Sequence, residues 1–276
     1  MNPEHIDRRR LKSDMKDVVR TAQVSARTMT GLYLGLGLLM SLVTYAGNLK
    51  GGPIALFLSI LTNLLSLVLG AGFVMYCMAI LRGERAEYLS LFDGFSIAGK
   101  FIALHIVQIS FIALWSMLFV VPGIIAAYRY RFAEYNLFEN PELGIFEVLD
   151  MSKRQTMGYK MQLFALDLSY FGWACLAVLP VMAESYLYSF ESVAVQFGSE
   201  PFLPVLSDTQ YFLWILISGL WQIGISLLYL PTYYCTELGF YEIAKSTSGI
   251  KPENFSAPTP SILSTRTTQL TAKKPM

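Results

Sequence analysis

Long apolar stretches without a single charged side chain dominate this sequence. Four of them contain no Asp, Glu, Lys or Arg, and they cover residues 28–49, 51–81, 101–128 and 209–236. A fifth stretch, 161–183, is apolar except for Asp167. A membrane-spanning helix needs about 20 predominantly apolar residues, so each of these stretches is long enough to cross a bilayer.

The composition excludes most other classes of protein. Apolar residues make up 54% of the chain and charged residues 15%, against roughly 25% charged residues in a soluble domain. The net charge is only +1, so we expect no nucleic-acid partner. The three cysteines (Cys77, Cys175 and Cys235) lie within apolar runs and lack C-x-x-C spacing, which predicts neither a disulfide framework nor a zinc site.

The segment 122–139 decides between five and six crossings. It carries Arg129, Arg131 and Glu134, so by hydropathy alone it could equally be a helix in water. Five crossings would divide the Lys and Arg residues almost evenly between the two sides, whereas six would leave Lys50 alone on the outer side. Cytoplasmic segments of membrane proteins carry an excess of Lys and Arg. Six crossings are therefore favoured, with Pro122-Gly123 separating this span from the preceding one.

The predicted fold is an all-α polytopic membrane protein with six transmembrane helices in three hairpins and amphipathic helices on the inner face. Residues 1–27 are predicted as a basic amphipathic helix, 28–245 as the membrane domain and 246–276 as a disordered cytoplasmic tail. The spans are expected at about 28–46, 53–81, 101–121, 122–139, 161–183 and 210–244. We expect a multi-pass protein of the cell membrane with both termini in the cytoplasm.

Two inner segments show helical patterns. Leu11 and Met15 recur at helical spacing in the basic N-terminal segment, which is typical of a helix on an anionic membrane surface; the alternative is an ordinary helix with a solvated charged face. Asn140-Pro141-Glu142 predicts a helix N-terminus, and Gly158 predicts its end. The outer segment 184–209 has four acidic residues, no Lys or Arg, and several aromatic residues, which favours a structured outer cap.

Four motifs then resemble a known family. They are L-F-D-G-F-S-I-A-G-K-F at 91–101, V-P-G-I-I-A-A-Y-R-Y at 121–130, E-N-P-E-L-G-I-F-E-V-L-D-M-S-K-R-Q-T-M-G-Y-K-M-Q-L-F at 139–164 and F-Y-E at 240–242. In order and spacing they are similar to the bacterial membrane family catalogued as domain of unknown function 975. The resemblance covers about residues 10–245, is strongest at 88–175, and implies a polytopic membrane protein with no established activity.

A charged cluster is the candidate site. It comprises Arg129, Arg131, Glu134, Asp167 and Glu237. At 1.5 Å per residue, Arg131, Asp167 and Glu237 lie about 13, 10 and 12 Å from the inner ends of their helices, at one level. Charges at such depth are costly and usually paired. The cluster is therefore either a structural ion-pair network or a polar pocket for an anion, a lipid headgroup or protons.

The sequence shows no catalytic signature. It lacks a phosphate-binding loop, a nucleophile elbow, a zinc-protease motif and a dinucleotide fingerprint. We therefore expect no enzyme activity, no cofactor and no metal. The expected function is that of a non-enzymatic membrane protein that acts through the lipid bilayer, including anionic headgroups, or through protein partners that the sequence does not identify. The alternative is a small-solute or lipid transporter that uses the charged cluster.

Overall fold

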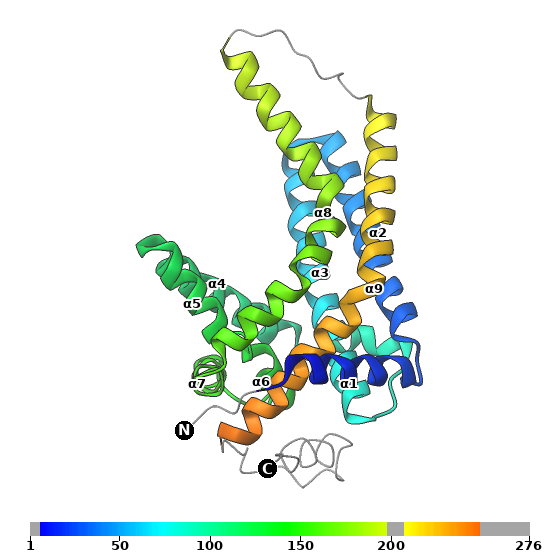
Figure 1. Cartoon of the computed structure of the whole chain (residues 1–276). Coiled ribbons are helices and arrows are strands. Elements are labelled where there is room, and N and C mark those ends of the chain that lie inside the picture. The colour runs from blue at the N-terminus through cyan, green and yellow to red at the C-terminus, as the bar shows by residue number, and fades with distance from the viewer. Residues whose placement is uncertain (1–5, 198–206, 249–276) are drawn as a thin grey trace. The chain divides into compact units, whose positions relative to one another are not determined.

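The computed structural model describes residues 6–197 and 207–248, and every regular element in these residues is a helix (Figure 1). The elements are α1 Arg8–Thr21, α2 Ala26–Lys50, α3 Gly52–Arg82, the 3-10 helix η1 Tyr88–Ile97, α4 Ala98–Leu118, α5 Val120–Arg129, α6 Ala133–Glu139, α7 Ile145–Gln155, α8 Lys160–Gln196 and α9 Asp208–Ser248. The predicted all-α fold is confirmed.

Five helical segments of the described chain are long and apolar enough to cross a membrane. They are Ala26–Lys50, Gly52–Arg82, Tyr88–Leu118, Lys160–Val193 and Asp208–Ser248. They correspond to the five stretches that the sequence predicts without reference to charge. The predicted arrangement of six helices in three hairpins is not confirmed, because the sixth segment differs from its prediction.

That sixth segment, 122–139, is not one helix. It contains most of α5 and all of α6, and the two are separated by a turn at 130–132. Tyr130, with φ −99° and ψ 7°, ends α5. The helix is interrupted because its polar groups bond elsewhere: the Arg129 carbonyl oxygen accepts bonds from the hydroxyls of Ser152 (2.9 Å) and Thr156 (3.2 Å).

The described chain divides into two compact units, which we describe separately. Unit 1 comprises Met1–Met29, Leu67–Ser169 and Pro231–Met276, and unit 2 comprises Thr30–Ser66 and Tyr170–Leu230. Helices α3, α8 and α9 each contribute residues to both units.

The core of unit 1 gathers side chains from α3, α4, α6 and α7. Its buried members are Ala71, Phe101, Leu104, Ala133, Leu137, Val148 and Leu149. Helix η1 packs closely on α3, because a Cβ atom on Gly72 would lie 1.8 Å from the carbonyl oxygen of Leu91. Burial of these apolar side chains stabilises the unit.

Helices α4 and α5 form a hairpin within unit 1 (Figure 1). The chain reverses at Phe119, which is extended, whereas Pro122 lies in the first turn of α5, where proline is tolerated. The reversal therefore falls three residues before the predicted Pro122-Gly123 break. Gly123 allows the close approach, since its Cβ would meet the Ser116 hydroxyl oxygen at 2.0 Å. The hairpin tip is apolar and exposed over 117–121.

The segment 140–158 also departs from its prediction. Helix α7 begins at Ile145 rather than beside Asn140, and the Glu147 carboxylate accepts the bond from the Gly144 N–H at 3.0 Å. Asn140 instead ends α6, and its amide donates to the carbonyl oxygen of Asn136. Gly158 follows the end of α7 and has a positive φ of 88°, as predicted for a helix stop.

Helix α1 buries its apolar side against protein. Asp7 caps its N-terminus by accepting bonds from the N–H groups of Arg9 and Arg10. Leu11 and Met15 are 3% and 1% exposed, and Leu11 packs against Gly239 of α9. The basic side chains of Arg8, Arg9, Arg10, Lys16 and Arg20 are exposed. Protein thus covers this part of the apolar stripe, while the basic face remains exposed.

Unit 2 contains most of α2, the start of α3, most of α8 and the start of α9. The α2–α3 turn uses Gly51 and Gly52, both at positive φ, which only glycine adopts without strain. Helices α8 and α9 are joined by the Trp214 indole N–H, which donates to Glu184. Because α8 continues to Gln196, residues 184–196 of the predicted outer cap at 184–209 are helical. Residues 246–248 of the predicted tail at 246–276 are the end of α9 and not disordered. Residues 198–206 of the cap and 249–276 of the tail lie outside the described residues.

Candidate functional site

Arg131 is the centre of an ion-pair network in unit 1. Its Nε donates to Glu237 at 2.6 Å, and its two terminal nitrogens donate to Asp167 at 3.0 and 3.1 Å. The second terminal nitrogen also lies 3.0 Å from Glu237. Each guanidinium nitrogen therefore donates to a carboxylate, and the predicted common level of Arg131, Asp167 and Glu237 corresponds to direct contacts between them.

Two tyrosines complete this network. The Tyr128 hydroxyl donates to Asp167 at 2.7 Å, and the Tyr233 hydroxyl donates to Asp167 at 2.9 Å. Tyr233 also accepts a bond from Arg131. Sequence reasoning missed both residues, although Tyr128 lies one helical turn before Arg131, which is a signal that could have identified it. Asp167 thus has four donors and Arg131 no unused nitrogen, as expected of a structural network.

The other two predicted members of the cluster, Glu134 and Arg129, do not take part in these hydrogen bonds and ion pairs. Glu134 lies in the first turn of α6 and forms no ion pair with Arg131 within 4 Å among the described residues. The turn at 130–132 removes the continuous helix on which the two were predicted to share a face.

Arg129 is the one arginine of this region that lacks an acidic partner in the described part of the chain. Its Nε is buried without a hydrogen-bond partner in these residues. A second cation, Lys160 at the start of α8, is close enough for the two positive charges to repel one another. Because like charges in proximity favour a bound anion, this pair is the part of the cluster that could hold a ligand.

A second network, which sequence reasoning missed, has a carboxylate at its centre. Glu139, 6% exposed, receives bonds from Lys245 at 2.5 Å and Tyr241 at 2.7 Å, and it also pairs with Arg82. Arg82 contacts Glu242 at 3.2 Å. Tyr241 and Glu242 belong to the F-Y-E motif, so that motif was the available signal. The network joins α3, α6 and α9.

A buried pair of amides lies beside the second network. Asn136 and Gln155 exchange two hydrogen bonds of 2.7 and 2.9 Å, and both side chains are at most 1% exposed. The Tyr241 hydroxyl donates to the same Asn136 oxygen at 3.1 Å. Each amide satisfies the other, which offsets the cost of burying them.

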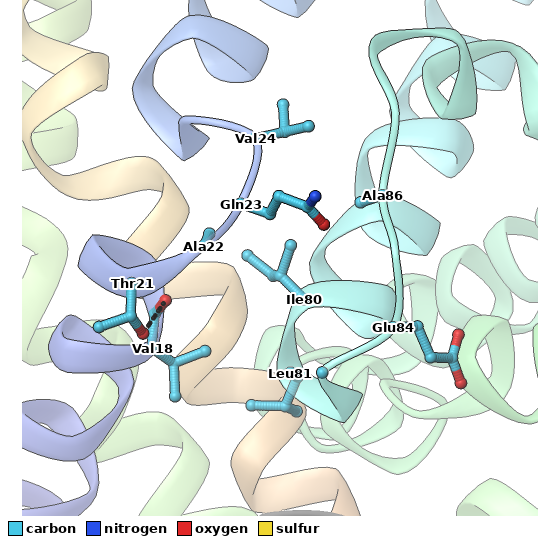
Figure 2. Close-up of a pocket in the computed structure, with 10 residues that line it drawn as sticks. Val18, Thr21, Ala22, Gln23, Val24, Ile80, Leu81, Glu84 and Ala86 are labelled. Atoms are coloured by element: carbon cyan, nitrogen blue, oxygen red, sulfur yellow. Dashed lines mark hydrogen bonds between the residues drawn. The ribbon is translucent and has the colours of Figure 1, made fainter.

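Three hollows of the described chain contain no residue of the charged cluster in their linings. Figure 2 shows one of about 230 Å³ in unit 1, where Gln23 extends from the α1–α2 linker toward Ile80 and Ala86. Another lies on the surface of α7, and a third lies in unit 2. None of these three is lined by a cluster residue. The described residues also contain no group of His, Cys, Asp and Glu that could hold a metal ion.

In the described residues, these features define a helical protein with five segments able to cross a membrane and with ion-pair networks that link two of them, α8 and α9, to the turn at 130–132, and α9 and α3 to α6. The family model described as "Protein of unknown function (DUF975)" matches residues 104–248 of the 276. The chain belongs to this family, as the motifs had indicated. The match includes both networks except Arg82. Comparison with curated proteins and with solved structures finds no match.

Proposed function

We propose that this is a non-enzymatic integral protein of the cell membrane that acts by binding anionic lipid, with Arg129 and Lys160 as the headgroup site. The observation that carries the proposal is the contrast between two neighbouring arginines. Arg131 donates to carboxylates from every nitrogen, whereas Arg129 has a cation beside it and no acid within 4 Å among the described residues. A pair of neighbouring cations, one with a buried nitrogen that has no partner among the described residues, is stabilised by a phosphate.

The position of the pair supports a lipid rather than a soluble anion. Lys160 is the first residue of α8, a helix long and apolar enough to span the membrane. Cations at the ends of membrane helices reach the headgroup level. The exposed basic side chains of α1 would add attraction to the same anionic leaflet, at about 1 kcal/mol for each residue near the surface. In this proposal both termini are cytoplasmic.

In this proposal, the sixth membrane crossing is a helix that is interrupted by a turn. Helix α5 alone, at ten residues, reaches about 15 Å, which is half of the hydrocarbon core. Together, α5, the turn and α6 extend over residues 120–139, which is enough for about 30 Å. Interrupted helices occur at membrane depth where protein satisfies their backbone groups, and Ser152 and Thr156 do so for Arg129.

The test is the effect of lipid on thermal unfolding of the purified protein in neutral detergent. Phosphatidylglycerol should raise the Tm more than phosphatidylcholine does, because only the former has a net negative headgroup. Arg129→Gln should remove at least half of that difference, and Arg154→Gln, which changes an exposed arginine paired with Asp150, should not. Equal stabilisation by the two lipids would refute the headgroup site. Stabilisation by inorganic phosphate alone would assign the pair to a soluble anion instead.

A further inference from the structure

Unit 2 contains a polar groove whose lining includes no residue of the charged cluster. It is about 330 Å³ in volume and open to the outside, and α2, α3 and α9 line it. Its hydrogen-bonding side chains on α2 and α3 are Ser41, Thr44, Tyr45, Asn48, Thr62, Asn63 and Ser66. No residue of its lining is charged. The groove therefore offers a hydrogen-bonding surface of no net charge.

This surface lies inside segments that are long and apolar enough to cross a membrane. On α2 the lining extends from Asn48, next to the helix end at Lys50, to Gly37. At 1.5 Å per residue that is a depth of about 16 Å, or half of the hydrocarbon core. Polar side chains at such depth are costly in lipid and usually line a water-filled cavity or a ligand pathway.

Helix association accounts for only part of this polarity. The hydroxyl oxygens of Thr44 and Thr62 lie 2.7 Å apart and join α2 to α3. Asn48 and Ser66, in contrast, form no side-chain hydrogen bond with any described residue. The groove therefore has hydrogen-bonding capacity beyond what joins the two helices.

The remaining capacity includes both donors and acceptors. Ser41, Thr62 and Asn63 donate to carbonyl oxygens of their own helices at 3.1, 2.8 and 2.7 Å. The lone pairs of their side-chain oxygens can still accept, and the amide of Asn48 and the hydroxyl of Ser66 can both donate and accept. A neutral array of donors and acceptors matches hydroxyl groups, which themselves donate and accept. The absence of any carboxylate from the lining leaves nothing to compensate a desolvated cation.

We propose that this groove binds a small uncharged group rich in hydroxyls, that is, a polyol or a sugar. The volume is within the range of small-molecule sites, and Tyr45 and Tyr211, whose ring centres lie 5.4 Å apart, are part of the same lining. The polyhydroxyl group could belong to a free solute or to a glycolipid headgroup. The inference rests on unit 2 alone and does not depend on the headgroup site proposed above.

The first experiment tests whether water enters the groove. In a Cys175→Ser background, Ser41→Cys is reacted with a membrane-impermeant, water-soluble maleimide in nanodiscs of phosphatidylcholine. Leu39→Cys is the matched control, because Leu39 lies two residues away on α2, is 51% exposed and does not line the groove. A thiol must ionise to react, so Ser41→Cys should react at least about tenfold faster than the control. Equal rates would overturn the proposal.

The second experiment tests the ligand by protection of Ser41→Cys. Free myo-inositol in solution, or monoglucosyl diacylglycerol in the nanodisc, should slow the reaction. Protection by inositol assigns the groove to a free polyol, and protection by the glycolipid alone assigns it to a headgroup. Protection by neither overturns the proposal.

A substitution in the groove lining tests whether the protection depends on this groove. Asn63→Leu removes the side-chain amide and should raise the half-protecting concentration about fivefold, the effect of one lost hydrogen bond to the ligand. Ser110→Ala is the control, because the Ser110 hydroxyl also bonds back to its own helix but lies outside the groove. The reaction rate without ligand shows whether Asn63→Leu is folded. Unchanged protection in a folded Asn63→Leu protein would refute the role of the groove.

Discussion

Removal of either carboxylate that pairs with Arg131 should destabilise the protein, and the loss should be larger for the more deeply buried carboxylate. The Glu237 side chain is 4% exposed and that of Asp167 is 27% exposed. Breaking a buried ion pair costs about 3–5 kcal/mol, so we expect this cost for Glu237→Gln. Asp167→Asn keeps the shape and leaves Glu237 in place, so it should cost about 1.5–3 kcal/mol, the value of a bond to a charged group.

The buried cysteines of unit 1 provide the assay. Cys77 and Cys235 are fully buried, so a maleimide dye that fluoresces on reaction reports unfolding, with Cys175→Ser to lower the background. About 2–4 °C per kcal/mol converts the costs to a loss in Tm of roughly 6–20 °C for Glu237→Gln and 3–12 °C for Asp167→Asn. Asp150→Asn is the control, because its pair with Arg154 lies on the surface and should contribute under about 1 kcal/mol.

A double-mutant cycle measures whether the contacts of Arg131 with Glu237 and Asp167 contribute to stability. In an Arg131→Gln background, the cost of Glu237→Gln should fall by at least about 1 kcal/mol, since the partner is already absent. The cost of Asp167→Asn should fall as well. Couplings within about 0.5 kcal/mol of zero for both carboxylates would refute the network as a source of stability, and with it the contrast between Arg131 and Arg129.

Two further predictions concern packing and orientation. Gly72→Ala should cost about 1–3 kcal/mol because the new Cβ meets the Leu91 carbonyl, whereas Gly224→Ala, with open space around it, should be neutral or stabilising; equal Tm values for the two variants would contradict the close contact. Lys153→Cys should react with an impermeant maleimide only after the cytoplasmic side is opened, and Lys50→Cys should react in intact cells; labelling of Lys153→Cys in intact cells would exclude the proposed orientation.

Hydropathy, together with the count of residues from each helix end, predicted the features that depend on a single helix. Apolar runs located the five long helices, and counting residues from helix ends placed Arg131, Asp167 and Glu237 at one level. These predictions succeed because the rise per residue is fixed and because a charge in an apolar run needs a partner.

The features that the sequence predicted wrongly or missed depend on contacts that the local residue pattern does not reveal. Asn140 has the features of a helix start, yet its amide bonds to the preceding α6. The Glu139 network was missed because Arg82, Glu139 and Lys245 lie near predicted helix ends, where charges are ordinary.

The break between α5 and α6 also has a consequence for how the protein is made. The Phe132 N–H and the Arg129 carbonyl both bond to the Ser152 hydroxyl, and Ser152 follows Phe132 by 20 residues. At about 5–20 residues per second, the ribosome supplies that hydroxyl roughly 1–4 s after the break emerges.

Glu237 follows Arg131 by 106 residues, which is roughly 5–20 s of synthesis at the same rate. During that interval the guanidinium lacks its most buried partner, and exposure to lipid would be costly. If the α5–α6 segment is the interrupted crossing proposed above, we expect it to remain in an aqueous or protein-lined environment until α9 is made and to insert after its translation.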